Sequence, residues 1–178
     1  MVKYNQEVIT LEYEIIYSDR RTLSLNVKGG ALIVRAPRGA KRRDIEKLIA
    51  DHTDWIEKHL AKSKRKEELY SSLGDEDIKR LKKLAKATLP EKTRYFAKLM
   101  GIKYGRITIT SAKTRFGSCS SEGNIAFSYR LMLYPEEAID YVVVHELAHR
   151  KELNHSPAFY KIVASVFPDY KYRKALLK

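Results

Sequence analysis

Three of the chain's five histidines fall within the segment HELAHRKELNHS, residues 145 to 156. An α-helix turns about 100° per residue, so on a helix His149 lies about 40° around the axis from His145 and one turn along it. Both imidazoles can therefore reach the same metal ion. Glu146 lies about 60° from His149, which places its carboxylate beside a water on that ion rather than as a third ligand. HELAH thus has the H-E-x-x-H pattern of a metal site with an adjacent base.

Hydrolysis by a metal-activated water is the chemistry that this arrangement predicts. A zinc ion with neutral imidazole ligands and one open position lowers the pKa of its bound water toward about 7. A carboxylate beside that water can take its proton and deliver it to a leaving amine. We therefore expect one Zn²⁺ ion on His145 and His149, with Glu146 as the general base of a peptidase. Imidazole ligands also accept Ni²⁺ or Fe²⁺, so the sequence does not fix the ion.

A catalytic zinc site needs a third protein ligand, and His155 is the nearest candidate. On a continuing helix His155 would point about 120° away from the face of His149. Asn154 tolerates the left-handed conformation that ends a helix, so a turn there can bring His155 back beneath the ion. Ser156 and Pro157 suit the N-cap and first residue of another helix, which would hold His155 between two helices. The alternative third ligands are Glu152, Asp169 and one of the other histidines.

The elements that must position these residues begin with a helix that starts at Pro135. Two glutamates and the nearly unbroken apolar run AIDYVVV follow, which predicts a deeply buried helix. Histidines and a glutamate on such a helix are costly unless they are paired or bound to metal. Strands are expected in GRITITSAK and GNIAFSYRLML, with the loop TRFGSCSSEG between them. A helix from Asp75 to Gly101, kinked or interrupted at Pro90, precedes these strands.

The first part of the chain has the alternating pattern of short strands. LEYEIIYS, RTLSLNV and ALIVRAP predict a small β-meander with a hairpin turn at Gly29–Gly30. Residues 41–60 then place apolar side chains at helical spacing, and we expect His52 and His59 to be ordinary residues of that helix. The predicted fold class is α+β. Its three parts are a β-meander plus helix (1–62), a connector (63–74) and a core with the metal helix (75–178).

Composition excludes several classes of protein. No apolar run of about eighteen residues is present, so we expect no membrane span, and the N-terminus lacks the features of a signal peptide. A single cysteine, Cys119, rules out an internal disulfide and favours the cytoplasm. The formal net charge of +13 suits nucleic acid or an acidic partner, although no nucleic-acid-binding signature accompanies it. The oligomeric state is not predicted.

The segment from RFGSCSSEG through HELAHRKELNHS to FPDYKYRK closely resembles the YgjP-like zinc metallopeptidases, a zincin family related to SprT-like and WLM domains. SDRRTLSLNVKGGALIVRAPRGAKRRDIEKLIADHTDWIEKHL is similar to the opening region of the same family, so the resemblance covers nearly the whole chain. It implies a zincin-like metalloprotease core in which the three clustered histidines hold the metal and Glu146 is the general base. The chain departs from the family at Phe116, where members usually have Trp. It departs from the metzincin pattern at Glu152, which stands in place of a glycine.

The loop and strand before the metal helix supply the expected substrate-binding groups. In zincins a peptide substrate commonly lies along an edge strand beside the ion and pairs through its backbone. We expect FGSCS or GNIAFSYR to supply that edge. Arg115, which directly precedes FGSCS, can steady the loop or stabilise an oxyanion. Cys119 fits a small buried side chain, a thiolate that blocks the metal, or an exposed thiol. The candidate substrate-binding residues are Arg115, Gly117, Ser118, Cys119 and Asn124.

A peptidase acting on peptides or proteins is the favoured function, and three alternatives stay open. The basic charge and the SprT-like relatives suggest a nucleic-acid-associated zinc protein, such as a protease of DNA-bound proteins. A purely structural zinc site usually has four closed ligands, often cysteines, and only Cys119 is available. A hydrolase of non-peptide amides would use the same ion and base, because neither of them chooses the substrate.

Overall fold

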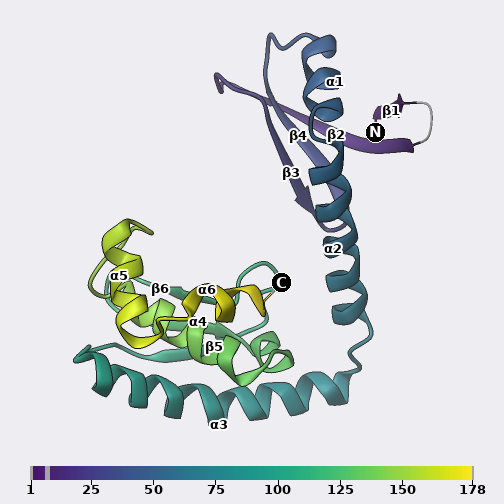
Figure 1. The fold of residues 1–178 in the computed structure, drawn as a ribbon. Coiled ribbons are helices and arrows are strands. Elements are labelled where there is room, and N and C mark those ends of the chain that lie inside the picture. Colours follow the sequence, from purple (N-terminus) through teal and green to yellow (C-terminus); the bar gives the residue numbers. More distant parts are fainter. Residues whose placement is uncertain (1, 7–8, 178) are drawn as a thin grey trace. The chain divides into compact units, whose positions relative to one another are not determined.

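The computed structural model describes residues 2–6 and 9–177. The chain divides into two compact units, Met1–Leu73 and Gly74–Lys178, which we call the N-terminal and C-terminal units. Both units combine strands with helices, which agrees with the α+β class expected from the sequence (Figure 1). Among the described residues, no helix is both long enough and apolar enough to cross a membrane.

A four-stranded sheet forms one layer of the N-terminal unit. Its strands follow the order β1-β2-β4-β3 and are β1 (Val2–Gln6), β2 (Ile9–Ser18), β3 (Ser24–Lys28) and β4 (Ala31–Pro37). β3 and β4 form the expected hairpin, whose turn holds Gly29 and Gly30 at φ 58° and 75°, a region that favours glycine. β2 pairs in parallel with β4, so the sheet differs from the simple meander that the alternation predicted. The alternation of apolar and polar residues indicates which face of a strand is buried, but it does not indicate which strand lies beside it.

Two helices complete this unit, α1 (Arg42–Ala50) and α2 (Thr53–Ser71). The single helix predicted over 41–60 is therefore two, because the backbone leaves helical geometry at His52 (φ −127°, ψ 23°). The predicted connector over 63–74 is wrong for most of its length, since α2 continues to Ser71. Lysine, arginine and glutamate are strong helix formers, so the polarity of this segment reflects an exposed helix rather than a linker.

An apolar core joins the sheet to the helices of the N-terminal unit. Leu32, Val34 and Ala36 alternate along β4, point to the same face and are fully buried. Burying a valine or leucine side chain stabilises the fold by about 1.5–3 kcal/mol. The other buried members of this core are Tyr13, Ile45, Ile49 and Ile56.

The C-terminal unit contains one long helix and a small sheet. α3 (Asp75–Met100) continues through Pro90, so the interruption considered there does not occur, and its C-cap is Gly101, the residue predicted to stop it. The sheet has the order β5-β7-β6, in which β5 (Ile107–Thr110) is parallel to β7 (Ile125–Ser128) and β6 (Gly117–Cys119) is antiparallel to β7. A 3₁₀ helix (Tyr129–Leu133) follows β7. β6 is an edge strand, because its outer side has no neighbouring strand within the described chain.

The helix α4 (Glu136–Ala148) lies at the centre of the C-terminal unit. It contacts α3, β6 and the last two helices, α5 (Pro157–Val166) and α6 (Tyr170–Ala175) (Figure 1). Val143 and Val144 are fully buried, as the run AIDYVVV predicted, and Leu147 of HELAH is fully buried too. The first turn of α4 is exposed at Glu136 and Glu137, but the rest of the helix is mostly buried by the elements around it. The end of such a helix is a rigid place for functional side chains.

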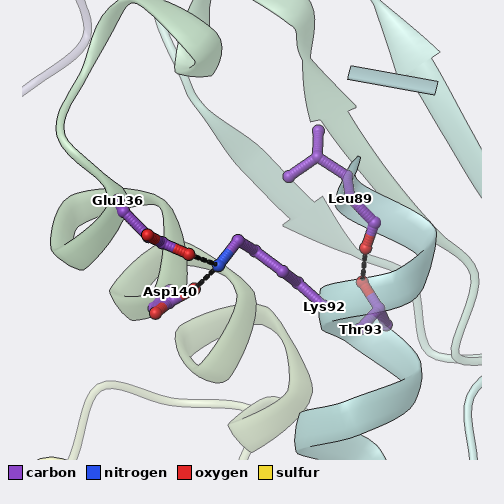
Figure 2. Close-up of polar contacts among 5 residues, drawn as sticks. All are labelled: Leu89, Lys92, Thr93, Glu136 and Asp140. Carbon is purple, nitrogen blue, oxygen red and sulfur yellow. Dashed lines mark hydrogen bonds and ion pairs between the residues drawn. The ribbon is translucent and has the colours of Figure 1, made fainter. Parts of the chain in front are cut away.

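Figure 2 shows how α3 is fixed to the start of α4. Lys92 of α3 donates to the carboxylates of Glu136 and Asp140, and its Nζ lies 2.7 Å from Asp140 Oδ1. Burial opposes the charge on Lys92, but these hydrogen bonds outweigh it and raise the pKa of the ammonium group. On the same helix, the buried hydroxyl of Thr93 donates to the Leu89 carbonyl at 2.7 Å. The two contacts of Lys92 tie the helix that carries HELAH to the long helix beside it.

Candidate metal centre

The candidate metal residues lie where α4 ends. His145 and Glu146 belong to its last turn, and His149 caps its C-terminus with α-helical backbone angles (φ −62°, ψ −14°). These three side chains therefore keep the helical spacing on which the interpretation of HELAH depends.

The chain reverses beyond α4 sooner than predicted. Arg150 and Lys151 each donate a backbone N–H to the carbonyl three residues earlier, and these bonds close the helix. No described residue other than glycine has a positive φ, so the left-handed turn expected at Asn154 is wrong. The next helix, α5, begins as predicted, with Ser156 as its N-cap, and this cap fixes the chain just after His155.

The reversal brings three imidazoles together. Nε2 of His145 and Nε2 of His155 lie 3.0 Å apart, and one ring nitrogen from each of His145, His149 and His155 lies within 4.8 Å of the others. Phe159 of α5 packs against these three rings at centroid distances of 4.8, 4.6 and 4.9 Å. It is fully buried, so it forms a rigid base beneath the imidazoles. His155 thus reaches the place that a third ligand requires, although it does not belong to α4.

The other candidates for the third ligand are not part of this cluster. Asp169 forms an ion pair with Arg173 at 2.9 Å. Glu152 contributes its backbone carbonyl, 3.2 Å from Nδ1 of His149. The remaining two histidines belong to the N-terminal unit. Within the described part of the chain, the three clustered histidines are the group of side chains with metal-binding spacing.

Hydrogen bonds at the outer ring nitrogens orient two of the imidazoles. The Glu152 carbonyl can only accept, so Nδ1 of His149 carries the proton and Nε2 keeps its lone pair. Nδ1 of His145 lies 3.4 Å from the hydroxyl of Tyr141, one turn earlier on α4. Contacts of this kind set the tautomer and ring orientation of histidines at metal sites. They leave the Nε2 atoms of both residues available to bind a metal.

The surroundings of His145 and His155 favour their neutral imidazoles. Burial, followed by the positive potentials of His149, His155 and Lys174, lowers the pKa of His145 to about 3. Burial also lowers the pKa of His155, with smaller contributions from His149 and Lys174. Neutral imidazole is the form that binds a metal. Three converging nitrogen donors with no carboxylate in the group fit a divalent ion that prefers nitrogen, such as zinc.

The carboxyl group of Glu146 lies against the edge strand β6. The residue is only 5% exposed, and burial raises its pKa to about 7 against the opposing effect of Arg115. A Cβ placed on Gly117 would lie 2.5 Å from Oε1 of Glu146 and 2.6 Å from its Cγ. Those distances are far shorter than a van der Waals contact, so any larger residue at 117 displaces the carboxyl.

A cavity of about 300 Å³ opens beside Glu146 and His145. Sequence reasoning missed Tyr141 as a wall residue, although a position four residues before His145 puts it on the same helical face. It also missed the contribution of α6 and the residues that follow it, because no spacing rule connects them to the metal helix. The lining residues besides Glu146 and His145 are Phe116, Gly117, Tyr141, Val142, Lys174 and Leu177.

One of the five predicted substrate-binding residues, Gly117, lines this cavity. Arg115 is exposed and does not line it, although its charge opposes the rise in the pKa of Glu146. Ser118 is half-buried in β6, between Gly117 and Cys119. The segment 115–118 therefore connects the cavity with the open edge of the sheet.

Cys119 and Asn124 are placed differently. Cys119 is half-buried and lies outside the histidine cluster, and burial raises the pKa of its thiol, which disfavours a metal-blocking thiolate. Asn124 does not line the cavity. Its Oδ1 accepts from the backbone N–H of Arg106 at 3.0 Å, and its Nδ2 donates to Glu122. The amide of Asn124 therefore holds the loop before β7 in place.

Comparison with known proteins agrees with this geometry. The family model "YgjP-like, metallopeptidase domain" matches residues 21–77 and 66–178. The chain belongs to the YgjP-like metallopeptidase family. No curated protein is similar enough to the chain to count as a match.

Two solved structures are similar to part of this YgjP-like chain. One is the metallopeptidase zymogen of Pyrococcus abyssi abylysin, with 24% identity and a TM-score of 0.47, which covers 51% of this chain and 91% of that one. The other is the metallopeptidase zymogen of Methanocaldococcus jannaschii jannalysin, with 20% identity and a TM-score of 0.45, which covers 50% of this chain and 92% of that one.

Proposed function

We propose that this chain is a zinc-dependent peptidase in which His145, His149 and His155 hold the ion and Glu146 is the general base. The observation that carries the proposal is the convergence of three imidazole nitrogens beside a buried carboxyl group. Membership of a metallopeptidase family supports it. A zinc ion bound by imidazoles lowers the pKa of water toward about 7 and polarises a carbonyl group.

Glu146 would carry the proton between the attacking water and the leaving group. Glu146 lines the cavity together with His145, the residue before it in the chain. From there it can take a proton from water and give that proton to the leaving amine nitrogen. The contact with Gly117 leaves the carboxyl little freedom to move toward β6. Such preorganisation favours both proton transfers.

The open side of β6 would bind the peptide backbone. β6 is an edge strand of three residues, and Gly117 within it touches the carboxyl of Glu146. An extended peptide that pairs with this edge therefore passes directly beside the proposed base. Arg115, exposed at the start of the same segment, is available to stabilise negative charge that develops on the substrate.

The Glu146→Gln variant tests the mechanism. We expect it to retain one zinc ion per chain, measured by mass spectrometry of the metal, and to lose cleavage of a broad peptide library. Glu137→Gln, which removes an exposed carboxylate from the same helix, should keep full activity. Full activity in a pure sample of Glu146→Gln would refute the role of this residue. A parallel set of non-peptide amides separates a peptidase from a broader amide hydrolase.

A protease of DNA-bound proteins is a second candidate function, which the distribution of charge favours. The C-terminal unit holds 20 Lys and Arg against 11 Asp and Glu, whereas the N-terminal unit holds 15 against 11. The unit with the histidine cluster is therefore the more basic of the two. Binding to duplex DNA that falls by a factor of about 1,000 or more between about 50 and 200 mM salt would support this function. Absence of binding at the lower salt concentration would exclude it.

A further inference from the structure

The cavity beside Glu146 has the size and lining of a pocket for a substrate side chain. Its volume is about 300 Å³, and an engineered cavity of about 150 Å³ in another protein holds a benzene molecule. Phe116, Tyr141, Val142 and Leu177 make most of its surface apolar. Because Glu146 also lines it, an apolar side chain placed here would belong to a residue close to the scissile bond.

Lys174 adds a cation to this apolar pocket. It is exposed on α6, and its Nζ lies 3.4 Å from the Tyr160 hydroxyl and 5.4 Å from the centroid of that ring. Among the described residues no carboxylate forms an ion pair with it. Its positive charge reaches the histidine cluster, where it lowers the pKa of His145 and His155. The pocket therefore presents a positive charge that the described chain does not neutralise.

Arg115 provides a second positive charge on the β6 side of the site. Its side chain is exposed, its charge acts on Glu146, and within the described residues it has no ion pair. Apart from the Glu146 carboxyl that lines it, the pocket therefore has two charged side chains nearby among the described residues, Lys174 and Arg115, and both are positive. Charge complementarity governs which partners enter such a site and how fast they arrive.

We propose that this site selects peptides that place an apolar side chain in the pocket and a carboxylate against Lys174, an inference that rests on the peptidase function proposed above. The carboxylate has two chemical sources, the C-terminus of a peptide or the side chain of an acidic residue next to the apolar one. Both give the same ion pair with the ammonium group. Lys174 is a specificity residue in this account, because it touches the substrate but not the bond that breaks.

Binding to a chain that cannot cleave tests the inference without relying on activity. The zinc-loaded full-length Glu146→Gln protein is titrated against short peptides that carry a neutral fluorophore at the N-terminus, and binding is followed by fluorescence anisotropy. All peptides contain one phenylalanine. The first ends in a free carboxylate, the second is its amide, and the third and fourth are amides with glutamate or glutamine after the phenylalanine.

We expect the free-carboxylate peptide, the glutamate peptide, or both to bind about fivefold more tightly at low salt than their neutral partners, as an exposed ion pair allows. Adding Lys174→Gln should remove this preference, and Lys174→Glu should reverse it. Lys161→Gln, which removes an exposed lysine of α5, should leave the preference unchanged. The peptide that shows the preference identifies the source of the carboxylate.

Three results would overturn the inference: no preference for a carboxylate, an equal preference after Lys174→Gln, or no binding of any peptide at millimolar concentration.

The experiment distinguishes failure of the peptidase proposal from failure of the specificity proposal. If zinc-loaded wild type cleaves charged and neutral peptides equally, the peptidase stands and the specificity does not. If carboxylate-dependent binding occurs but wild type cleaves none of the peptides, the peptidase proposal fails and the binding site stands.

Discussion

The two units of the chain use histidine in opposite ways. In the N-terminal unit, Nδ1 of His52 lies 2.9 Å from the Leu48 carbonyl of the preceding helix α1, and Nδ1 of His59 lies 2.7 Å from the Trp55 carbonyl of its own helix α2. In the C-terminal unit, ring nitrogens converge on one another. Histidines on a helix are therefore not a metal site by themselves. What differs is the reversal after α4, which brings His155 to the helix from another segment.

The ion pairs of the two units differ in how exposed their side chains are. Lys92 and Asp140 join two helices of the C-terminal unit, and their side chains are 19% and 17% exposed. Arg38 and Asp19 in the N-terminal unit are 74% and 87% exposed. Solvent screens the second pair, so it contributes little to stability, whereas the first pair is partly buried. The stronger interactions thus lie around the helix that carries HELAH.

Replacing a clustered histidine with alanine should have the largest effect. We expect His149→Ala or His155→Ala to weaken zinc binding by at least about 100-fold, because losing an outer hydrogen-bond partner alone weakens metal binding by about 10- to 100-fold. Competition with a chromophoric chelator measures the affinity. The matched control is His59→Ala in the N-terminal unit, which should bind zinc as the wild type does. Wild-type affinity in His155→Ala would mean that this residue is not a ligand.

Gly117→Ala should lower kcat/KM by about 100-fold while zinc stays bound, because a displacement of about 1 Å at a catalytic group costs about this much. The added Cβ would meet Oε1 of Glu146 at 2.5 Å, whereas a Cβ on Gly39 of the N-terminal unit meets nothing within 4 Å. Gly39→Ala is therefore the control, and it should leave activity unchanged. Equal activity of the two variants would show that the position of the Glu146 carboxyl does not matter.

Lys92→Gln should destabilise the chain by about 2 kcal/mol, because it leaves the partly buried Asp140 without its charged partner. Urea unfolding monitored by circular dichroism measures the loss. Arg38→Gln, the exposed counterpart, should change the free energy of unfolding by less than about 0.5 kcal/mol. If both substitutions cost the same, burial does not distinguish the two ion pairs.

Tyr141→Phe should have the smallest effect, a loss of zinc affinity of about 10-fold. The substitution removes the hydroxyl that lies 3.4 Å from Nδ1 of His145 but keeps the ring that lines the cavity. Tyr95→Phe, on an exposed face of α3, is the control. An unchanged affinity in Tyr141→Phe would show that this contact does not orient the imidazole.

Local patterns in the sequence predicted the parts of the site that one segment contains. HELAH placed two histidines and a glutamate on a buried helix, and Ser156 was correctly expected to begin α5. The turn between them was predicted in the wrong place. Backbone hydrogen bonds at Arg150 and Lys151 end the helix, and these depend on packing that sequence spacing does not reveal.

Features that join distant segments could not be predicted in this way. β2 pairs in parallel with β4, although β3 lies between them in the sequence. The alternation of apolar and polar residues does not indicate which strands pair. α2 extends to Ser71 through residues whose polarity suggested a connector. Lys174 reaches the cavity from a helix of six residues, which is too short to show an amphipathic period. Each of these features depends on contacts between segments rather than on the pattern within one.

X-ray absorption spectroscopy at the zinc edge is the most direct test of the proposed metal centre. The zinc-loaded wild type should show three imidazole nitrogens at about 2.0–2.1 Å, with a further light atom, and His155→Ala should lose one of the imidazoles. Fewer than three imidazoles in the wild type, or a sulfur at about 2.3 Å from Cys119, would contradict the account.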